Sequence, residues 1–255
     1  MKILSLAFNL LLILGFAQGC SNEKNISSGE PISHEQWDKL VKKHVTEEGY
    51  VNYEGFIEDS VALNRYLNQL SNHHPNDSWS KNERLAYWLN AYNAFTVKLI
   101  LDNWPVESIK DIAGGIPFVN TAWDVKFIEI EGEKYDLNNI EHGIIRKEFD
   151  EPRIHFAVNC ASVSCPKLRN EAYTSEELDS QLDDQARDFI NGPKNEIKEN
   201  EVRLSRLFKW YGGDFTKKMG LKEFVNQYAE QKIGNEVEVE FKEYDWRLNI
   251  KENYR

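Results

Sequence analysis

Residues 159–166 read Asn-Cys-Ala-Ser-Val-Ser-Cys-Pro and carry two of the three cysteines in the chain, Cys160 and Cys165. A thiol becomes a nucleophile when its pKa is lowered and a base is near, and strand ends commonly provide such surroundings. Alternating apolar residues over 154–158 predict a strand that ends at Cys160. Cys160 is therefore a candidate nucleophile for a hydrolase or acyltransferase that attacks an amide or ester carbonyl. Backbone N–H groups beside Cys160 would stabilise the oxyanion.

Two histidines, His142 and His155, are the candidate bases. On a straight strand, His155 would lie about 16 Å from Cys160, because each residue adds about 3.3 Å, and this is too far for proton transfer. His142 lies on a separate predicted helix over 137–146 and can fold back against Cys160, so we expect it to handle the proton. Asn90 could orient the imidazole, as an amide does in papain-like sites.

The same residues also fit two other kinds of site, a structural disulfide and a metal site. Cys160 and Cys165 can reach the Cα separation of a disulfide, about 4.4–6.8 Å, within a loop. Such a bridge would hold a loop of a non-catalytic binding or scaffold module. A metal site built from Cys160, Cys165, His142 and His155 is a further alternative, although the histidine spacing matches no recognised zinc pattern. We predict no cofactor. The other four histidines are expected to be solvated or to cap helices: His34, His44, His73 and His74.

The clearest predicted element is a helix over residues 80–102. Ser80 with Glu83 matches the capping-box pattern, and the helix is apolar nearly all round, which is typical of a buried helix. Asn90 and Asn93 lie inside it, and a buried amide costs about 1–3 kcal/mol if it is left without a partner. Both amides therefore either brace other segments or belong to a polar site.

The remaining elements mix helices with antiparallel hairpins and show no βαβ rhythm. The predicted fold class is therefore α+β, a helix-rich single domain with a small antiparallel sheet. Helices are expected to begin near Ser33, to bury Phe56, Leu63 and Leu70, and to span about 175–190. Strands are expected at 123–130 and 133–136 around Gly132, between Ile197 and Leu204, and near 237–241.

Several motifs occur together and in one order along residues 35–250. They are Gly49-Tyr50-Val51-Asn52-Tyr53, Ala86-Tyr87-Trp88-Leu89-Asn90-Ala91-Tyr92-Asn93-Ala94, Ile140-Glu141-His142-Gly143-Ile144-Ile145-Arg146, His155 to Pro166, and Tyr244-Asp245-Trp246-Arg247-Leu248-Asn249. In this set the chain resembles the domain of unknown function family 547. The resemblance implies one domain over nearly the whole mature chain and leaves the reaction open.

The order of the candidate residues suggests a second, looser likeness. A histidine that precedes the cysteine reverses the papain arrangement and is similar to circularly permuted members of that superfamily. A permuted papain-like or transglutaminase-like core is therefore our expectation for the fold, by analogy.

The first nineteen residues, 1–19, predict an export signal. Lys2 is followed by an apolar stretch over 3–14, which is shorter than the roughly 20 residues that a membrane-spanning helix needs. Cleavage before Cys20 fits a lipoprotein signal and also an ordinary signal peptide. Lipidation of Cys20 would leave an even pair of cysteines in an oxidising compartment, and we favour it for that reason.

Composition limits the partners. The net charge is −11 and the sequence has no basic cluster, which excludes nucleic acid as a partner. We expect a lipid-anchored protein of the bacterial cell envelope, facing the periplasm or the outer surface. Residues 20–32 would be a polar tether and residues 33–255 a single globular domain. Contact with the membrane would come only through the lipid on Cys20, and the partner would be an unknown peptide or small-molecule ligand.

Overall fold

The computed structural model describes residues 29–113 and 121–254. The predicted export signal, Cys20 and most of the tether lie outside the described residues. No helix in the described ranges is long and apolar enough to cross a membrane.

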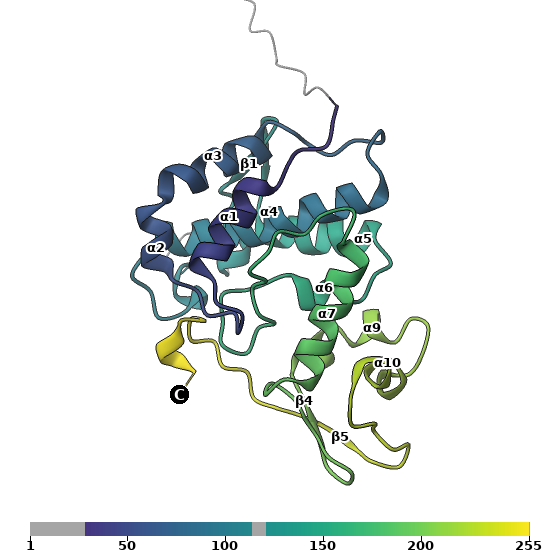
Figure 1. Cartoon of the computed structure of the whole chain (residues 1–255). Helices are drawn as coiled ribbons and strands as arrows, with labels where there is room; N and C mark the ends of the chain where they lie inside the picture. The colour runs from purple at the N-terminus through teal and green to yellow at the C-terminus, as the bar shows by residue number, and fades with distance from the viewer. Residues whose placement is uncertain (1–28, 114–120, 255) are drawn as a thin grey trace, which may run out of the picture.

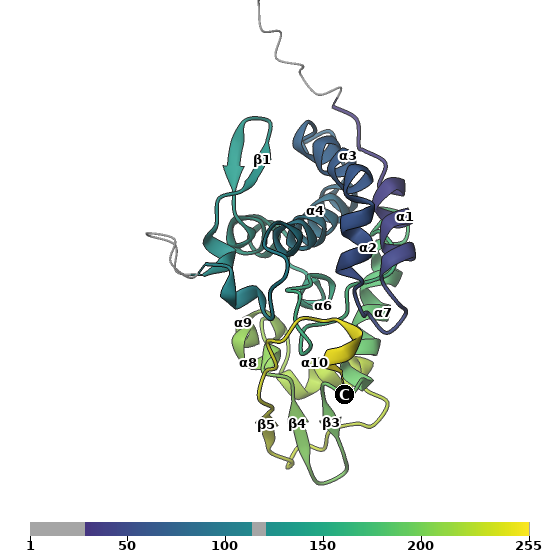
Figure 2. The same ribbon diagram turned by 90° about the vertical axis from the view of Figure 1, so that its left-hand side faces the viewer.

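The helix α4 (Lys81–Asp102) forms the centre of the larger hydrophobic core. Its predicted capping box is confirmed, since the Ser80 side chain accepts from the backbone of Glu83 and the Glu83 side chain accepts from Ser80. In Figure 1 and Figure 2 three shorter helices lie along one end of α4. They are α1 (Glu35–His44), α2 (Tyr53–Glu58) and α3 (Ser60–Ser71). The helix expected around Phe56 to Leu70 is interrupted at Asp59, so this segment forms two helices.

A second hydrophobic core lies below the first in Figure 1 and gathers around Phe156. Its helices are α7 (Leu178–Asn191), α8 (Leu207–Trp210), α9 (Gly212–Phe215) and α10 (Leu221–Tyr228). Its strands are β3 (Glu196–Ile197), β4 (Val202–Leu204) and β5 (Val239–Phe241). The β3–β4 hairpin is antiparallel, as predicted, whereas β4 and β5 pair in parallel. The expectation of a purely antiparallel sheet was wrong, because β5 returns to β4 only after three intervening helices.

A separate hairpin, β1 (Ile128–Ile130) and β2 (Glu133–Tyr135), lies at the opposite end of the molecule from the three-stranded sheet (Figure 2). Its turn residues Glu131 and Gly132 have φ of 50° and 84°. Two consecutive positive φ values are what a tight hairpin with right-handed twist requires. Short 3₁₀ turns complete the chain: η1 (Ile109–Asp111), η2 (Ala122–Asp124) and η4 (Lys251–Asn253). The predicted helix-rich α+β class is confirmed.

Two predicted elements differ near the cysteines. The strand expected over 154–158 is one helical turn, α6 (Ile154–Ala157), and every residue in it is buried. A short apolar run that is buried on all sides cannot be assigned to strand or helix from its periodicity. The helix expected over 137–146 is a π-helix, η3 (Asn139–Ile145), followed by the short α5 (Arg146–Glu148). Such π-helical turns occur frequently at functional sites.

Candidate functional site

A pocket of about 300 Å³ lies where the two cores meet. Val158, from the larger core, and Leu207, from the second, both line it. The same pocket is lined by both described cysteines, by His142 and His155, and by Glu141. Six aromatic side chains also line it: Tyr92, Trp123, Trp210, Tyr211, Tyr244 and Trp246. Three of the four residues proposed from the sequence therefore share one pocket.

The Cys160 thiol is surrounded by hydrogen-bonding groups. Its Sγ lies 2.7 Å from Sγ of Cys165 and 3.3 Å from the hydroxyls of both Ser162 and Tyr244. The two cysteines are not bridged. Burial opposes ionisation of Cys160, but the hydrogen bonds from Cys165, Ser162 and Tyr244 together outweigh it and lower its pKa. Burial and the neighbouring Cys160 raise the pKa of Cys165. Cys160 is therefore the thiol that ionises first.

The C-terminal chain brings Tyr244 to this site. After β5 it runs back beside the cysteine segment, where the backbone N–H of Ser164 donates to the carbonyl of Asp245 and that of Asn249 donates to Ala161. In Figure 2 this yellow segment passes between the helical part and the three-stranded sheet. Tyr244 therefore reaches Cys160 from 84 residues away.

The backbone at Cys160 is strained. Ala161 has φ of 58°, in the left-handed region that residues other than glycine rarely occupy. The N–H of Cys160 donates to Sγ of Cys165, and the N–H of Ala161 donates to the side chain of Asn159. These two groups are already bound, so they are not the free oxyanion donors expected from the sequence. Apart from the Cys165 thiol, the hydroxyls of Tyr244 and Ser162 are the hydrogen-bonding groups beside the sulfur.

His155 lies wholly buried on α6 and is held by an acidic partner. Its Nε2 lies 2.8 Å from Oδ2 of Asp214, and its ring stacks on Tyr211 at a centroid distance of 3.9 Å. Burial lowers the pKa of His155, which keeps the ring neutral. Because a carboxylate can only accept, Nε2 carries the proton and Nδ1 is left as a base. Nδ1 has no hydrogen-bond partner among the described residues.

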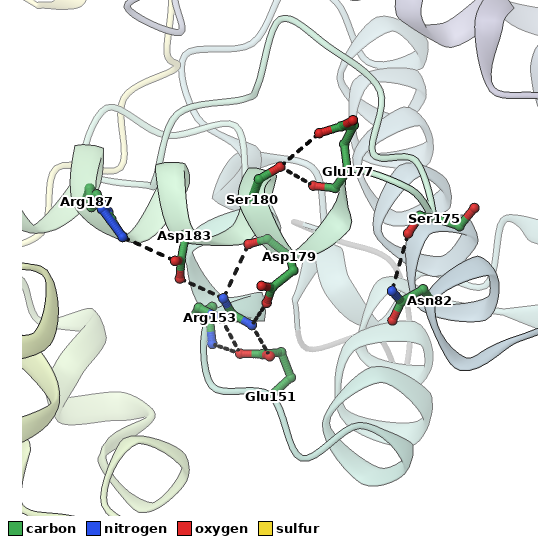
Figure 3. A network of polar contacts seen from close by, with 9 residues as sticks. All are labelled: Asn82, Glu151, Arg153, Ser175, Glu177, Asp179, Ser180, Asp183 and Arg187. Carbon is green, nitrogen blue, oxygen red and sulfur yellow. Dashed lines mark hydrogen bonds and ion pairs between the residues drawn. The ribbon is translucent and has the colours of Figure 1, made fainter.

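An ion-pair network fixes the start of α6 (Figure 3). Arg153, the residue before that helix, pairs with Glu151 at 2.6 Å and with Asp179 and Asp183 of α7 at 2.7 Å each. Its side chain is only 14% exposed, so these bonds are more effective than those of a solvated pair. The network ties the turn that carries His155 to the longest helix of the second core.

His142 is exposed on η3, and its Nδ1 has a hydrogen-bond partner, unlike that of His155. Nη1 of Arg146 lies 2.9 Å from Nδ1 of His142, and Nε of Arg146 lies 2.6 Å from Asp214. Arginine can only donate, so Nδ1 of His142 is an acceptor and the proton of the neutral ring sits on Nε2. The Arg146–Asp214 pair thus links both histidines. Neither imidazole is among the hydrogen-bond partners of Cys160 described above.

Asn90 lies outside this pocket. Its amide group bonds both backbone groups of Tyr173, donating to the carbonyl at 2.8 Å and accepting from the N–H at 2.9 Å. The amide therefore braces a loop, and it does not orient either histidine. Asn93 takes the place nearer to the site, because it bonds the carbonyl of Ala157 and the N–H of Asn159. It holds the segment between His155 and Cys160 against α4.

Two acidic residues of the site were not singled out from the sequence. Glu141 is 3% exposed, and its Oε1 has no hydrogen-bond partner within the described part of the chain. Asp214 stands in a Gly-Gly-Asp-Phe stretch on the short α9, where nothing in the sequence links it to His155. In the sequence, only the position of Glu141 next to His142 could have indicated that it belongs to the site.

Two of the remaining histidines, His44 and His34, make defined side-chain contacts. His44 is 5% exposed and pairs with Asp59 at 2.7 Å, so the expectation of a solvated or capping residue was wrong. His34 bonds the hydroxyl of Tyr66 at 2.7 Å, and burial lowers its pKa to about 4. The described residues also contain no group of three or more His, Cys, Asp or Glu side chains arranged to hold a metal ion. The alternative of a Cys/His metal site thus finds no support in them.

The fold and the pocket define a helix-rich α+β protein in which two thiols and a histidine paired with an aspartate line one pocket. A family model described as "Protein of unknown function, DUF547" matches residues 76–190, which include both pocket cysteines and both pocket histidines. Over these residues the chain resembles that family, as its motifs indicated. No curated protein and no solved structure matches the chain. Asp214 and Tyr244 lie beyond the matched range.

Proposed function

We propose that the protein is a cysteine-dependent hydrolase or acyltransferase that acts on an amide or ester bond. The observation that carries this proposal is the arrangement at Cys160. Its sulfur has three hydrogen-bonding neighbours that favour the thiolate, and it lines the same pocket as a neutral histidine paired with an aspartate. A lowered thiol pKa and a nearby base are what nucleophilic catalysis needs.

The first step forms an acyl-enzyme. The Cys160 thiolate attacks the carbonyl carbon, a C–S bond forms, and the carbonyl π electrons move to oxygen. The hydroxyls of Tyr244 and Ser162, which lie beside the sulfur, would donate to that oxyanion. Collapse of the tetrahedral intermediate breaks the bond to the amine or alcohol, and this leaving group takes the proton that His155 received from the thiol. Water or an amine acceptor then attacks the thioester and restores Cys160.

We assign the proton to His155, where the sequence favoured His142. His155 has its Nδ1 lone pair free, since Nε2–H is committed to Asp214. Arg146 occupies Nδ1 of His142, and the other nitrogen of that neutral ring already carries a proton. Asp214 holds the tautomer of His155, as the aspartate does in serine-protease triads.

The cellular location of the protein is part of the same proposal. Residues 1–19 support export, and the small residue before Cys20 supports lipid attachment there. The protein would then act in the cell envelope on a peptide or small-molecule ligand. Metabolic labelling with a radioactive fatty acid tests this part: wild type should be labelled and the Cys20→Ala variant should not. Equal labelling of both would contradict the anchor.

A non-catalytic binding or scaffold module is the second candidate. It is favoured by the contact between the two sulfur atoms, 2.7 Å apart, which places them within reach of a bridge. A bridge would consume the nucleophile and hold the segment from Cys160 to Cys165 closed. Such a module would lose stability, and no activity, when both cysteines are replaced.

One experiment separates the two candidates. The protein is alkylated with iodoacetamide over a pH series, and each cysteine is quantified by peptide mass spectrometry. We expect Cys160 to react readily below pH 8.5, about the pKa of a free cysteine, and Cys165 to react slowly. Protection of both thiols, released only by a reductant, would support the bridged module. A Cys160 profile like that of a free thiol would contradict the proposed nucleophile.

A further inference from the structure

Glu141 is a buried carboxylate that the proposed reaction does not use. It is 3% exposed and lines the pocket, and its Oε1 has no partner among the described residues. The negative charge of Glu141 raises the pKa of Tyr211, after the larger effect of burial. A buried charge with an unused acceptor is costly, and this cost is offset when a cationic donor arrives.

The charges around the pocket favour such a donor. Glu141 is the only carboxylate among the described lining residues, and no lysine or arginine is among them. A carboxylate in this setting attracts a positive group and repels a negative one. The overall charge of −11 acts in the same direction at longer range.

The walls of the pocket are suited to the same ligand. Six aromatic rings line it, and π faces attract ammonium groups, most strongly when water is excluded. Two of these rings already hold cations from the chain: Lys110 lies 5.1 Å from the centroid of Trp246, and Arg146 lies 5.1 Å from that of Tyr211. Trp210 is 47% exposed and stacks on Trp246 at 5.7 Å, so it extends the aromatic surface to the mouth of the pocket.

We infer that the pocket binds an organic ammonium group, with the cation against Glu141 and its alkyl part against the aromatic walls. This inference deepens the proposed function, on which it rests for the role of Cys160: the amide or ester substrate, or the amine that accepts the acyl group, carries a positive charge. The ligand class is an aliphatic amine or a quaternary ammonium.

Ammonium binding would also affect the nucleophile. The negative charge of Glu141 acts on Cys160 and raises its pKa, against the stronger effect of the hydrogen bonds. A cation beside Glu141 offsets that charge, so the thiolate becomes easier to form when the ligand is bound. The substrate would thus contribute to the activation of Cys160.

Charged thiol reagents test the inference on the full-length protein. In each reagent, the Cys160 thiolate attacks the thiosulfonate sulfur, a mixed disulfide forms and methanesulfinate leaves. The rate with the trimethylammonium-ethyl reagent is divided by the rate with neutral methyl methanethiosulfonate, and the ratio is normalised to the urea-unfolded chain. Loss of the Cys160 thiol is followed by peptide mass spectrometry, which also counts any later exchange with Cys165. Taking the ratio cancels any change in the pKa of Cys160.

We expect a normalised ratio of about ten, which corresponds to the free energy of a cation–π contact combined with a charge pair. The isosteric Glu141→Gln variant should lose most of this preference. Glu148→Gln is the matched control, because Glu148 is an exposed glutamate close by in sequence that does not line the pocket. It should keep the preference. A ratio near one in wild type, or an unchanged ratio in Glu141→Gln with native near-UV circular dichroism, overturns the inference.

A binding measurement separates this inference from the proposed reaction. Tryptophan fluorescence of the Cys160→Ala variant is titrated with butylammonium chloride and, in parallel, with butanol. Tighter binding of the ammonium, lost again when Glu141→Gln is added, supports the cation site even if no hydrolysis is ever detected. Equal binding of both ligands overturns the cation site and leaves the nucleophilic role of Cys160 standing on its own alkylation profile.

Discussion

Two regions of the molecule contain nearly the same histidine–aspartate pair. In one, Nε2 of His44 lies 2.7 Å from Oδ2 of Asp59, and Lys43 pairs with the same oxygen at 2.6 Å. In the other, Nε2 of His155 lies 2.8 Å from Oδ2 of Asp214, and Arg146 pairs with that oxygen at 2.6 Å. Both imidazoles are almost wholly buried.

The surroundings of the two pairs differ. His44 packs on Phe56 at a centroid distance of 4.9 Å and lies close to Gly55, with no cysteine lining its cavity. His155 has an unpartnered Nδ1 and shares its pocket with the two thiols. The pair geometry alone therefore does not define a site. A reactive neighbour and an unused nitrogen are what distinguish the second pair from a structural one.

The largest expected effect comes from replacing the histidine of each pair and comparing the two variants. In His155→Gln, acylation of Cys160 by a nitrophenyl ester should slow by on the order of 10²-fold, the lower end of what a general base contributes. His44→Gln is the matched control and should change this rate less than about twofold, while lowering the melting temperature because a buried hydrogen bond to Asp59 is lost. Stopped-flow absorbance gives the rates. Equal slowing in both variants would show that His155 acts only through stability.

A second prediction concerns the thiol pair, the feature that His44 lacks. Cys165→Ala removes one of the hydrogen bonds that lower the pKa of Cys160, so that pKa should rise. At pH 7 the thiolate fraction, and with it the alkylation rate, should fall by about tenfold for each unit of rise. The pH midpoint of iodoacetamide labelling measures this shift. A midpoint that stays in place, or moves to lower pH, contradicts the role assigned to Cys165.

The two aspartates give a prediction about pH. Hydrogen bonds from His155, and less strongly from Arg146, lower the pKa of Asp214, and those from Lys43 and His44 lower that of Asp59. A carboxylate with a lowered folded-state pKa stabilises the fold above its unfolded value of about 3.9, and this stability is lost as the pH falls toward the folded value. Urea unfolding below pH 5 should therefore show a flatter acid dependence in both Asp214→Asn and Asp59→Asn.

Only one of these aspartate variants should affect the thiol chemistry. Asp214→Asn offers His155 an amide in place of the carboxylate, so the tautomer with a free Nδ1 is no longer favoured. We expect Cys160 acylation to slow by about tenfold or more in Asp214→Asn and to stay unchanged in Asp59→Asn. A fall of similar size in both would make the two pairs equivalent and remove the distinction drawn here.

The sequence predicted the elements far better than it predicted this site. The capping box at Ser80 and the turn at Gly132 are local signals, and both were found where expected. Cys160 and His142 could be proposed because they lie in dense motifs, but their partners could not. Asp214 and Tyr244 reach the pocket through the packing of the second core and the return of the C-terminal chain, which no local pattern encodes.

The error over 154–158 has a single physical cause. Ile154, His155, Phe156 and Ala157 are all buried, so the alternation that suggested a strand carried no information about which face is inside. A straight strand would leave His155 too far from Cys160 for proton transfer, and for this reason the sequence favours His142 as the base. A helical turn brings His155 to the same pocket as Cys160 and reverses that preference.

The smallest expected effect on the thiol chemistry comes from a substitution beside His44, at Gly55. A Cβ added at Gly55 would lie 2.4 Å from Nδ1 of His44, closer than any real contact, so the ring must shift. Gly55→Ala should therefore destabilise the fold by about 1–3 kcal/mol through overpacking. Cys160 acylation and labelling should stay within about twofold of wild type at 25 °C, because no catalytic group touches this pair. Urea unfolding and the ester assay measure the two quantities on the same preparation. A large loss of acylation in a folded Gly55→Ala protein would show that the two pairs are coupled, and His44 could no longer serve as the structural reference for His155.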